Sequence, residues 1–264
     1  GDFSARIAKS TSQDELADLE TQINAMLTRI ETLMGAMREV TDNLAHDLRS
    51  PLTRLRTRLE KMLLADTSPE NGEAVEQSLA DIDQLLALFA SVLTLSGIDS
   101  GTADIRRDVV PMKPLVDDLV ELYRAMFEEA DWQLEYVVEA HIDAFEVTGD
   151  AQLLAQALVN LLENAMAHGA GDTRHLRIEL GRDAGAVTVT LADHGGGVPE
   201  HELAHIRQRF VRLDDSRSHP GNGLGLSLVD AICRHHGGQF VLNANQPSGL
   251  RAQIRLTENG QADG

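Results

Sequence analysis

The chain has 264 residues, of which 42% are hydrophobic and 25% charged, so it is expected to fold as about two globular domains. Its formal net charge of -19 argues against a nucleic-acid partner, because binding along a phosphate backbone requires clustered Lys and Arg. A single cysteine, Cys233, excludes an internal disulfide and suits a reducing compartment.

The sequence shows no obvious membrane-spanning segment. No run approaches the 18 apolar residues of a membrane span, so none is expected within the chain. The sequence begins with Gly1 instead of Met, and we therefore expect it to be a fragment of a longer protein.

The first third of the chain has helical periodicity. Apolar residues recur every three or four positions from Leu16 to Met62, which predicts a coiled coil or a bundle. Residues 66–72 have turn chemistry, and a second periodic run follows from Val75 to Leu93. Two long helices with a short connection predict an antiparallel hairpin. Since one hairpin cannot bury its own apolar stripe, we expect a homodimer with a four-helix bundle.

After Gly97–Gly101 ends the hairpin, the pattern is mixed. We expect helices near 112–130, 150–167 and 223–236, and strands near 132–138, 174–181, 186–192, 239–244 and 250–256. This order predicts an α+β layer sandwich. The polar residues after Thr257 are expected to fray.

One candidate site lies in the segment NLAHDLRSPL. His46 and Ser50 fall on the helix face opposite the leucine seam, so the imidazole is expected to face water. Asp47 could hold one ring N–H and leave the other nitrogen as a nucleophile. Pro51 is expected to kink the helix after the histidine. Alternatively, Ser50 caps a new helix that starts at Pro51, and His46 is an ordinary surface residue.

A second candidate site is split over three segments. Asn160 and Asn164 lie one helical turn apart and offer amide oxygens that suit Mg²⁺. Asp193 ends an apolar strand and is followed by three glycines, so that a planar base could approach the backbone and donate to the carboxylate. The segment GNGLGL runs into a helix, whose N-terminal amides suit phosphate. Each segment also has an ordinary structural interpretation: the asparagines as surface amides, the glycines after Asp193 as a turn, and GNGLGL as a loop that leads into a helix.

A third motif, HELAH at residues 201–205, matches the zinc-protease pattern HExxH. Composition alone produces such a match in roughly one chain in forty, and a protease would also need a third ligand and a buried helix. We therefore interpret this motif as a coincidence. His235 and His236, at a helix end, are expected to be surface residues.

Taken in order, these segments resemble the sensor histidine kinases of two-component systems. AHDLRSPL looks like the phosphoacceptor box, NLLENA like the asparagine box, DHGGGV and GNGLGL like the two glycine boxes, and RFVRLD like the phenylalanine box. Residues 1–37 resemble part of a HAMP module, its connector and second helix. The resemblance therefore implies a multidomain chain: an all-α hairpin that forms a dimeric four-helix bundle, then a two-layer Bergerat ATP-binding fold like that of gyrase and Hsp90.

The resemblance also implies domain bounds and roles. The phosphoacceptor hairpin would span 38–97, a linker 98–107, the ATP-binding domain 108–257 and a tail 258–264. His46 would accept the γ-phosphoryl group of ATP, Asp47 would orient or deprotonate it, and Ser50 would stand where bifunctional members have their phosphatase residue. Asn160 and Asn164 would hold Mg²⁺. The remaining nucleotide contacts would be His168, Asp193, Gly195, Gly197, Phe210, Arg212, Gly221, Gly223, Leu224 and Gly225.

The implied activity is autophosphorylation on histidine, then transfer to an aspartate in the receiver domain of a response regulator, with possible phosphatase activity. The chain would be the cytoplasmic portion of an inner-membrane receptor, attached through a missing N-terminal part. Three residues depart from the family pattern. Ala167 replaces a phosphate-contacting cation, a role left to Arg209, Arg212 or Arg217; Ser50 replaces Thr or Asn; and His194 replaces Asn or Asp. Two rival hypotheses are an ATPase clamp without autophosphorylation and a dimeric nucleotide-binding scaffold without turnover.

Overall fold

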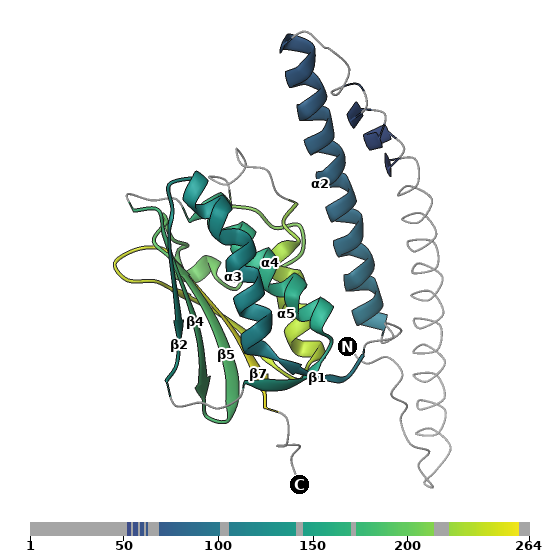
Figure 1. Cartoon of the computed structure of the whole chain (residues 1–264). Helices are drawn as coiled ribbons and strands as arrows, with labels where there is room; N and C mark the ends of the chain where they lie inside the picture. The colour runs from purple at the N-terminus through teal and green to yellow at the C-terminus, as the bar shows by residue number, and fades with distance from the viewer. Residues whose placement is uncertain are drawn as a thin grey trace, which may run out of the picture. The chain divides into compact units, whose positions relative to one another are not determined.

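The computed structural model describes residues 69–100, 106–140, 145–169, 173–213 and 222–258, with helical positions at 52–53, 55–57, 59–60 and 62 (Figure 1). The chain divides into two compact units, Gly1–Ser96 and Gly97–Gly264, which are considered separately below.

The first unit contains most of the long helix α2, Pro69–Ser100, whose last four residues belong to the second unit. The predicted turn over 66–72 is therefore too long, since the helix already begins at Pro69, a residue whose missing N–H costs nothing at a first helical position. The preceding helical positions lie beside α2, because Arg56 Nη1 pairs with Asp83 Oδ1 at 2.7 Å. This contact agrees with the predicted helical hairpin.

One property of α2 was not expected from the sequence. Among the described residues, the stretch Val75–Ser100 is long and apolar enough to cross a membrane by length and composition, with a mean hydropathy of 1.5. A bundle helix that buries a broad apolar stripe meets the same criterion. The property therefore does not by itself assign α2 to a membrane.

The second unit contains a two-layer α+β sandwich. Its elements are β1 (Asp108–Pro111), α3 (Met112–Glu129), β2 (Gln133–Val138), β3 (Glu146–Gly149), α4 (Ala151–His168), β4 (His175–Asp183), β5 (Ala186–Asp193), η1 (Glu200–Glu202), α5 (Gly225–His235), β6 (Gln239–Ala244) and β7 (Leu250–Thr257). The main sheet has the order β2-β4-β5-β7-β6, with β2 parallel to β4 and the other pairs antiparallel. Helices α3, α4 and α5 cover one face of it (Figure 1).

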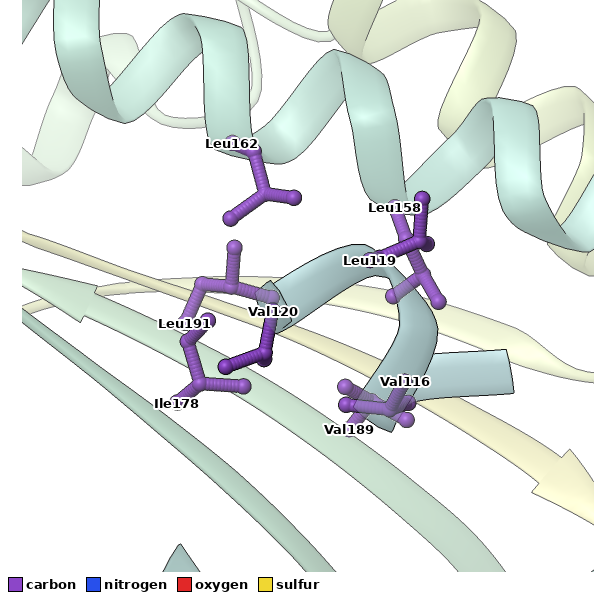
Figure 2. Close-up of a pocket in the computed structure, with 8 residues that line it drawn as sticks. All are labelled: Val116, Leu119, Val120, Leu158, Leu162, Ile178, Val189 and Leu191. Atoms are coloured by element: carbon purple, nitrogen blue, oxygen red, sulfur yellow. The ribbon is translucent and has the colours of Figure 1, made fainter. Parts of the chain in front are cut away.

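The core lies between this sheet and the helices. Strand β4 alternates, with Leu176, Ile178 and Leu180 buried and the residues between them partly exposed, as expected for a sheet covered on one face. Figure 2 shows eight apolar side chains from α3, α4, β4 and β5 that converge on a void of about 10 Å³. This is near the lower limit for one water molecule, so the helices are closely packed on the sheet.

The small antiparallel sheet formed by β1 and β3 was not predicted from the sequence. Each strand has four residues, too few for alternation to be recognised, and their pairing joins distant parts of the chain. The tail prediction was wrong at its first residue. Glu258 forms a bridge to Val147, and its carboxylate pairs with Arg182.

Candidate nucleotide site

The predicted site residues divide into two groups. His46, Asp47, Ser50, Arg217 and Gly221 lie outside the described residues, so their assignment remains a prediction. The others lie on α4, at the end of β5, in the segment before residue 214 and at the start of α5. These elements carry the three segments proposed above for a nucleotide.

Asp193 is the last residue of β5, and its side chain is only 7% exposed. Its Oδ1 accepts hydrogen bonds from the backbone N–H groups of Gly195, at 2.9 Å, and Leu250, at 3.1 Å. No side-chain oxygen in the described part of the chain is both buried and without a partner. Both of the hydrogen bonds from Gly195 and Leu250 end on Oδ1, so the second oxygen, Oδ2, is the one that a ligand can use as an acceptor.

Burial sets the protonation chemistry of this carboxyl group. Burial raises the pKa of Asp193, whereas the amides of Gly195 and Leu250 and the imidazoles of His194 and His168 lower it. The two hydrogen bonds from these backbone N–H groups stabilise the charged carboxylate, which is the form that accepts a hydrogen bond from an exocyclic amine.

Glycines surround Asp193 at distances that no Cβ would tolerate. A Cβ added at Gly169 would lie 2.7 Å from the Asp193 Cβ, and one added at Gly249 would lie 2.0 Å from the Asp193 carbonyl oxygen. At Gly195 it would lie 2.7 Å from the Cα of Gly169. This glycine cradle, formed by Gly169, Gly195 and Gly249, brings three backbone segments against one carboxylate.

Gly197 has a different role from the cradle residues. Its φ of +73° is one that L side chains rarely adopt, and a Cβ there would lie 3.1 Å from the Gly249 carbonyl oxygen. Gly197 therefore shapes the turn after β5. Gly169 and Gly249 were not predicted from the sequence. Gly169 looks like the end of a helix, and Gly249 looks like part of an ordinary Pro-Ser-Gly turn.

The two asparagines of α4 are both partly buried. Asn160 Nδ2 donates to the Gln156 carbonyl oxygen at 2.8 Å, which turns its Oδ1 away from its own helix. A Cβ at Gly225 would lie 3.1 Å from that oxygen. The amide oxygen of Asn160 therefore faces the first residue of α5. Asn164 lies one turn further along α4, and the exposed His168 ends the helix.

The start of α5 is connected to the predicted phenylalanine box. Phe210 donates its backbone N–H to the Gly223 carbonyl oxygen at 2.8 Å. Both residues have positive φ, +61° and +66°, and a Cβ at Gly223 would lie 2.8 Å from the Val211 carbonyl oxygen. Phe210 is 67% exposed, so the backbone hydrogen bond to Gly223, not burial of the ring, holds this residue in its strained conformation.

This contact holds Phe210 next to Gly223, just before the start of α5. Leu224, at the N-cap position of α5, is 3% exposed and secures the helix start in the core. Arg212 is partly buried within the same segment.

His236 corrects the expectation of a surface residue. Its Nε2 accepts the backbone N–H of Asp150 at 3.0 Å, and its Nδ1 donates to the Ile232 carbonyl oxygen at 2.8 Å. Asp150 is also the N-cap of α4, where its Oδ1 accepts from Gln152 and Leu153. His236 thus joins the end of α5 to the start of α4, the two helices that carry the site.

The HExxH motif does not form a zinc site. Only Glu200–Glu202 is helical, as one 3₁₀ turn, and the His201 side chain is 79% exposed. Both histidines pair with the same Glu202, His201 at 3.6 Å and His205 at 2.9 Å. The coincidence interpretation agrees with this geometry.

Two family models match the chain. The His Kinase A (phospho-acceptor) domain matches residues 36–101, and the histidine kinase-, DNA gyrase B- and HSP90-like ATPase family matches residues 149–260. The α+β domain thus has the fold of this ATPase class.

Curated proteins that are similar to this chain are named as sensor proteins or as a histidine-protein kinase/phosphatase. Sensor protein IrlS of Burkholderia pseudomallei is 32% identical over 228 residues, which cover 85% of this chain and 48% of the relative. Sensor protein CzcS of Cupriavidus metallidurans is 31% identical over 258 residues, covering 97% and 52%. The kinase/phosphatase MprB of Mycobacterium avium is 29% identical over 245 residues, covering 89% and 45%. The chain therefore spans about half the length of these relatives.

Two solved structures share the fold. Full-length ShkA in complex with AMPPNP superimposes with a TM-score of 0.68 at 24% identity, covering 83% of this chain and 45% of ShkA. The Acinetobacter baumannii histidine kinase AdeS gives a TM-score of 0.54 at 22% identity, covering 81% and 98%. The chain belongs to the sensor histidine kinases of two-component systems.

Proposed function

We propose that this chain binds ATP in the α+β domain, transfers its γ-phosphoryl group to His46, and passes that group to an aspartate of a response regulator. The observation that carries the proposal is the buried Asp193 carboxylate within the glycine cradle, whose two backbone hydrogen bonds both end on Oδ1 and leave Oδ2 for a ligand. An adenine amine suits this acceptor, and a planar ring suits the space that the glycines leave.

ATP and Mg²⁺ fit the remaining residues. Gly223, Leu224 and Gly225 would place phosphates at the N-terminus of α5, where backbone N–H groups are free. Asn160 and Asn164 would hold Mg²⁺, supported by the outward Oδ1 of Asn160. Bound there, Mg²⁺ would neutralise phosphate charge. Full-length ShkA, which shares the fold, was solved with AMPPNP, and this supports the choice of an adenine nucleotide.

The other predicted contacts, His168, Gly195, Gly197, Phe210, Arg212 and Gly221, complete the proposed nucleotide site. Arg209 and Arg212 are the described candidates for the charge that Ala167 lacks, and Arg209 is paired with Asp99 at 2.5 Å.

The chemical step joins the two proposed sites. An imidazole nitrogen of His46 would form a bond to the γ-phosphorus as the bond to the bridging oxygen breaks, and ADP would leave. Asp47 would orient the ring and take its proton. Catalysis of this kind is mainly positioning and charge neutralisation.

A phosphatase activity toward the response regulator is part of the proposal. The relatives named MprB are described as histidine-protein kinase/phosphatase, and their similarity supports it. Ser50 would provide the polar group for that reaction.

The proposed assembly is a homodimer that meets the receiver domain of a response regulator. The exposed apolar side chains of the helical unit support the dimer: Leu55 is 46%, Met62 55% and Leu85 43% exposed. We place the chain on the cytoplasmic side of a membrane receptor, in keeping with relatives named sensor proteins that are about twice as long. The bounds 38–97, 98–107 and 108–257 remain part of the prediction.

Purified chain incubated with γ-labelled ATP and Mg²⁺ tests the proposal. We expect acid-labile label on the protein that is absent from His46→Gln and reduced in Asp193→Asn when ATP is below saturation. Free phosphate without labelled protein would instead indicate an ATPase clamp. Nucleotide binding with neither product would indicate a scaffold, and either result would overturn the kinase proposal.

A further inference from the structure

His194, one of the three residues that depart from the family pattern, lies against a histidine of the neighbouring strand. Leu176 of β4 pairs with Asp193 of β5 at the end of the ladder, so His175 and His194 are the next opposed residues. Leu176 and Asp193 are buried on the side of the helices, and side chains alternate along strands. The two histidines therefore lie on the face of the sheet that α3, α4 and α5 leave uncovered (Figure 1).

The two imidazoles approach each other through their Nδ1 atoms. His175 Nδ1 and His194 Nδ1 are 3.2 Å apart, and the ring centroids are 4.9 Å apart. Two nitrogens bound to one tetrahedral Zn²⁺ at ~2.0–2.1 Å lie about 3.3 Å apart. The pair thus has the spacing of two ligands of one ion.

A carboxylate orients one of these rings from behind. Glu135 Oε2 lies 3.5 Å from His175 Nε2, which favours a proton on that nitrogen and directs the lone pair of Nδ1 toward His194. A carboxylate on the far nitrogen of a histidine is the usual outer contact of a metal-bound imidazole.

The surroundings admit a cation. His175 is 24% exposed and His194 is partly exposed, so solvent reaches the pair. Arg177, two residues beyond His175 on β4, is paired with Glu135 at 3.3 Å and with Glu179 at 2.7 Å, which offsets its charge. The net charge of -19 also favours the approach of a cation.

We propose that His175 and His194 form a binding site for a divalent transition-metal ion of the Zn²⁺ class, on the opposite side of β5 from Asp193. Within the described ranges no three His, Cys, Asp or Glu side chains converge on one point. The chain therefore supplies two ligands, and water completes the coordination. This inference is independent of the proposed kinase activity. The competing explanation is a single N–H···N hydrogen bond between two neutral rings.

Calorimetric titration of the metal-free full chain with ZnCl₂, without nucleotide, tests the proposal. We expect one Zn²⁺ site that is lost in both His175→Gln and His194→Gln. Glu135→Gln is expected to weaken it about 10- to 100-fold, as loss of an outer contact does. The matched control is the double variant His201→Gln with His205→Gln, which removes another histidine pair and should bind as the wild type does.

Two results would overturn the proposal. One is Zn²⁺ binding that both single variants retain; the other is binding lost only in the His201 and His205 control. Circular dichroism of each variant verifies the fold, and X-ray absorption of the Zn²⁺ complex is expected to show two imidazole nitrogens. A complex without imidazole ligands would contradict the site even if the variants failed to fold.

Discussion

Asp193 divides its two carboxylate oxygens between the fold and the ligand. Oδ1 accepts both hydrogen bonds from the backbone N–H groups of Gly195 and Leu250, which leaves Oδ2 for the proposed ligand. This division separates the binding role of the residue from its structural role, so a substitution can remove one and keep the other.

Asp193→Asn is expected to weaken ATP binding about 10- to 100-fold, the effect of losing a hydrogen bond to a charged group. The amide oxygen can still accept from Gly195 and Leu250, while its NH₂ group would face the adenine amine. Titration with a fluorescent ATP analogue measures the affinity, and thermal unfolding verifies the fold. Unchanged affinity in a folded variant would show that Asp193 does not read the base.

Gly249→Ala is expected to lower the free energy of unfolding by about 1–3 kcal/mol, because φ is +113° and the added Cβ meets the Asp193 carbonyl oxygen. Gly196→Ala is the matched control, since a Cβ there meets no atom within 4 Å, and its effect should stay within about 0.5 kcal/mol. Urea unfolding measures both. Equal effects would contradict the close approach at Gly249.

Some residues of this site could be predicted from the sequence, and others could not. Asp193 and Gly195 could be predicted, because a carboxylate and glycines after an apolar strand form a local pattern. Gly169 and Gly249 could not, because their need for glycine comes from backbone contacts with a distant strand. The role of His236 was missed for the same reason, since its partner is the backbone N–H of Asp150.

At the scale of elements, the long periodic segments were predictable and the short ones were not. The helices and strands expected from residue 112 onward match α3 to α5, β2 and β4 to β7, because each buries one face with a clear period. Strands β1 and β3 were missed, since a four-residue strand carries little pattern. The parallel pairing of β2 with β4 also depends on the whole fold.

The link between α5 and α4 predicts a pH-dependent stability. Burial lowers the pKa of His236 below its ordinary value of 6.5, so the unfolded chain binds the proton more readily than the folded one. The free energy of unfolding should therefore fall as the pH drops below 6.5, and the loss should level off below the folded-state pKa. Thermal unfolding of the wild type between about pH 8 and about pH 5.5 measures this slope.

In His236→Gln the slope should be shallower, because the proton-binding difference at this residue is gone. Burial also lowers the pKa of His235, so a smaller slope should remain. His201→Gln changes an exposed histidine and should keep the wild-type profile. Identical slopes in the wild type and His236→Gln would contradict this account.

At the scale of the whole molecule, the exposed apolar residues of the helical unit predict self-association. Light scattering of the full chain should give twice the 28.8 kDa of one chain. Leu85→Glu places a charge on an exposed apolar side chain of α2 and should shift the population toward the monomer. Ala80→Glu, at another exposed position of the same helix, is the matched control. A wild-type monomer would contradict the dimer.

The central claim is that the nucleotide site of the α+β domain phosphorylates His46. Mass spectrometry of the chain after reaction with ATP and Mg²⁺, with the peptides kept at alkaline pH, tests it most directly. We expect one phosphate on the peptide that contains His46, and less of it in Asp193→Asn when ATP is below saturation. Phosphate on another residue, or on His46 at the wild-type level in Asp193→Asn, would contradict it.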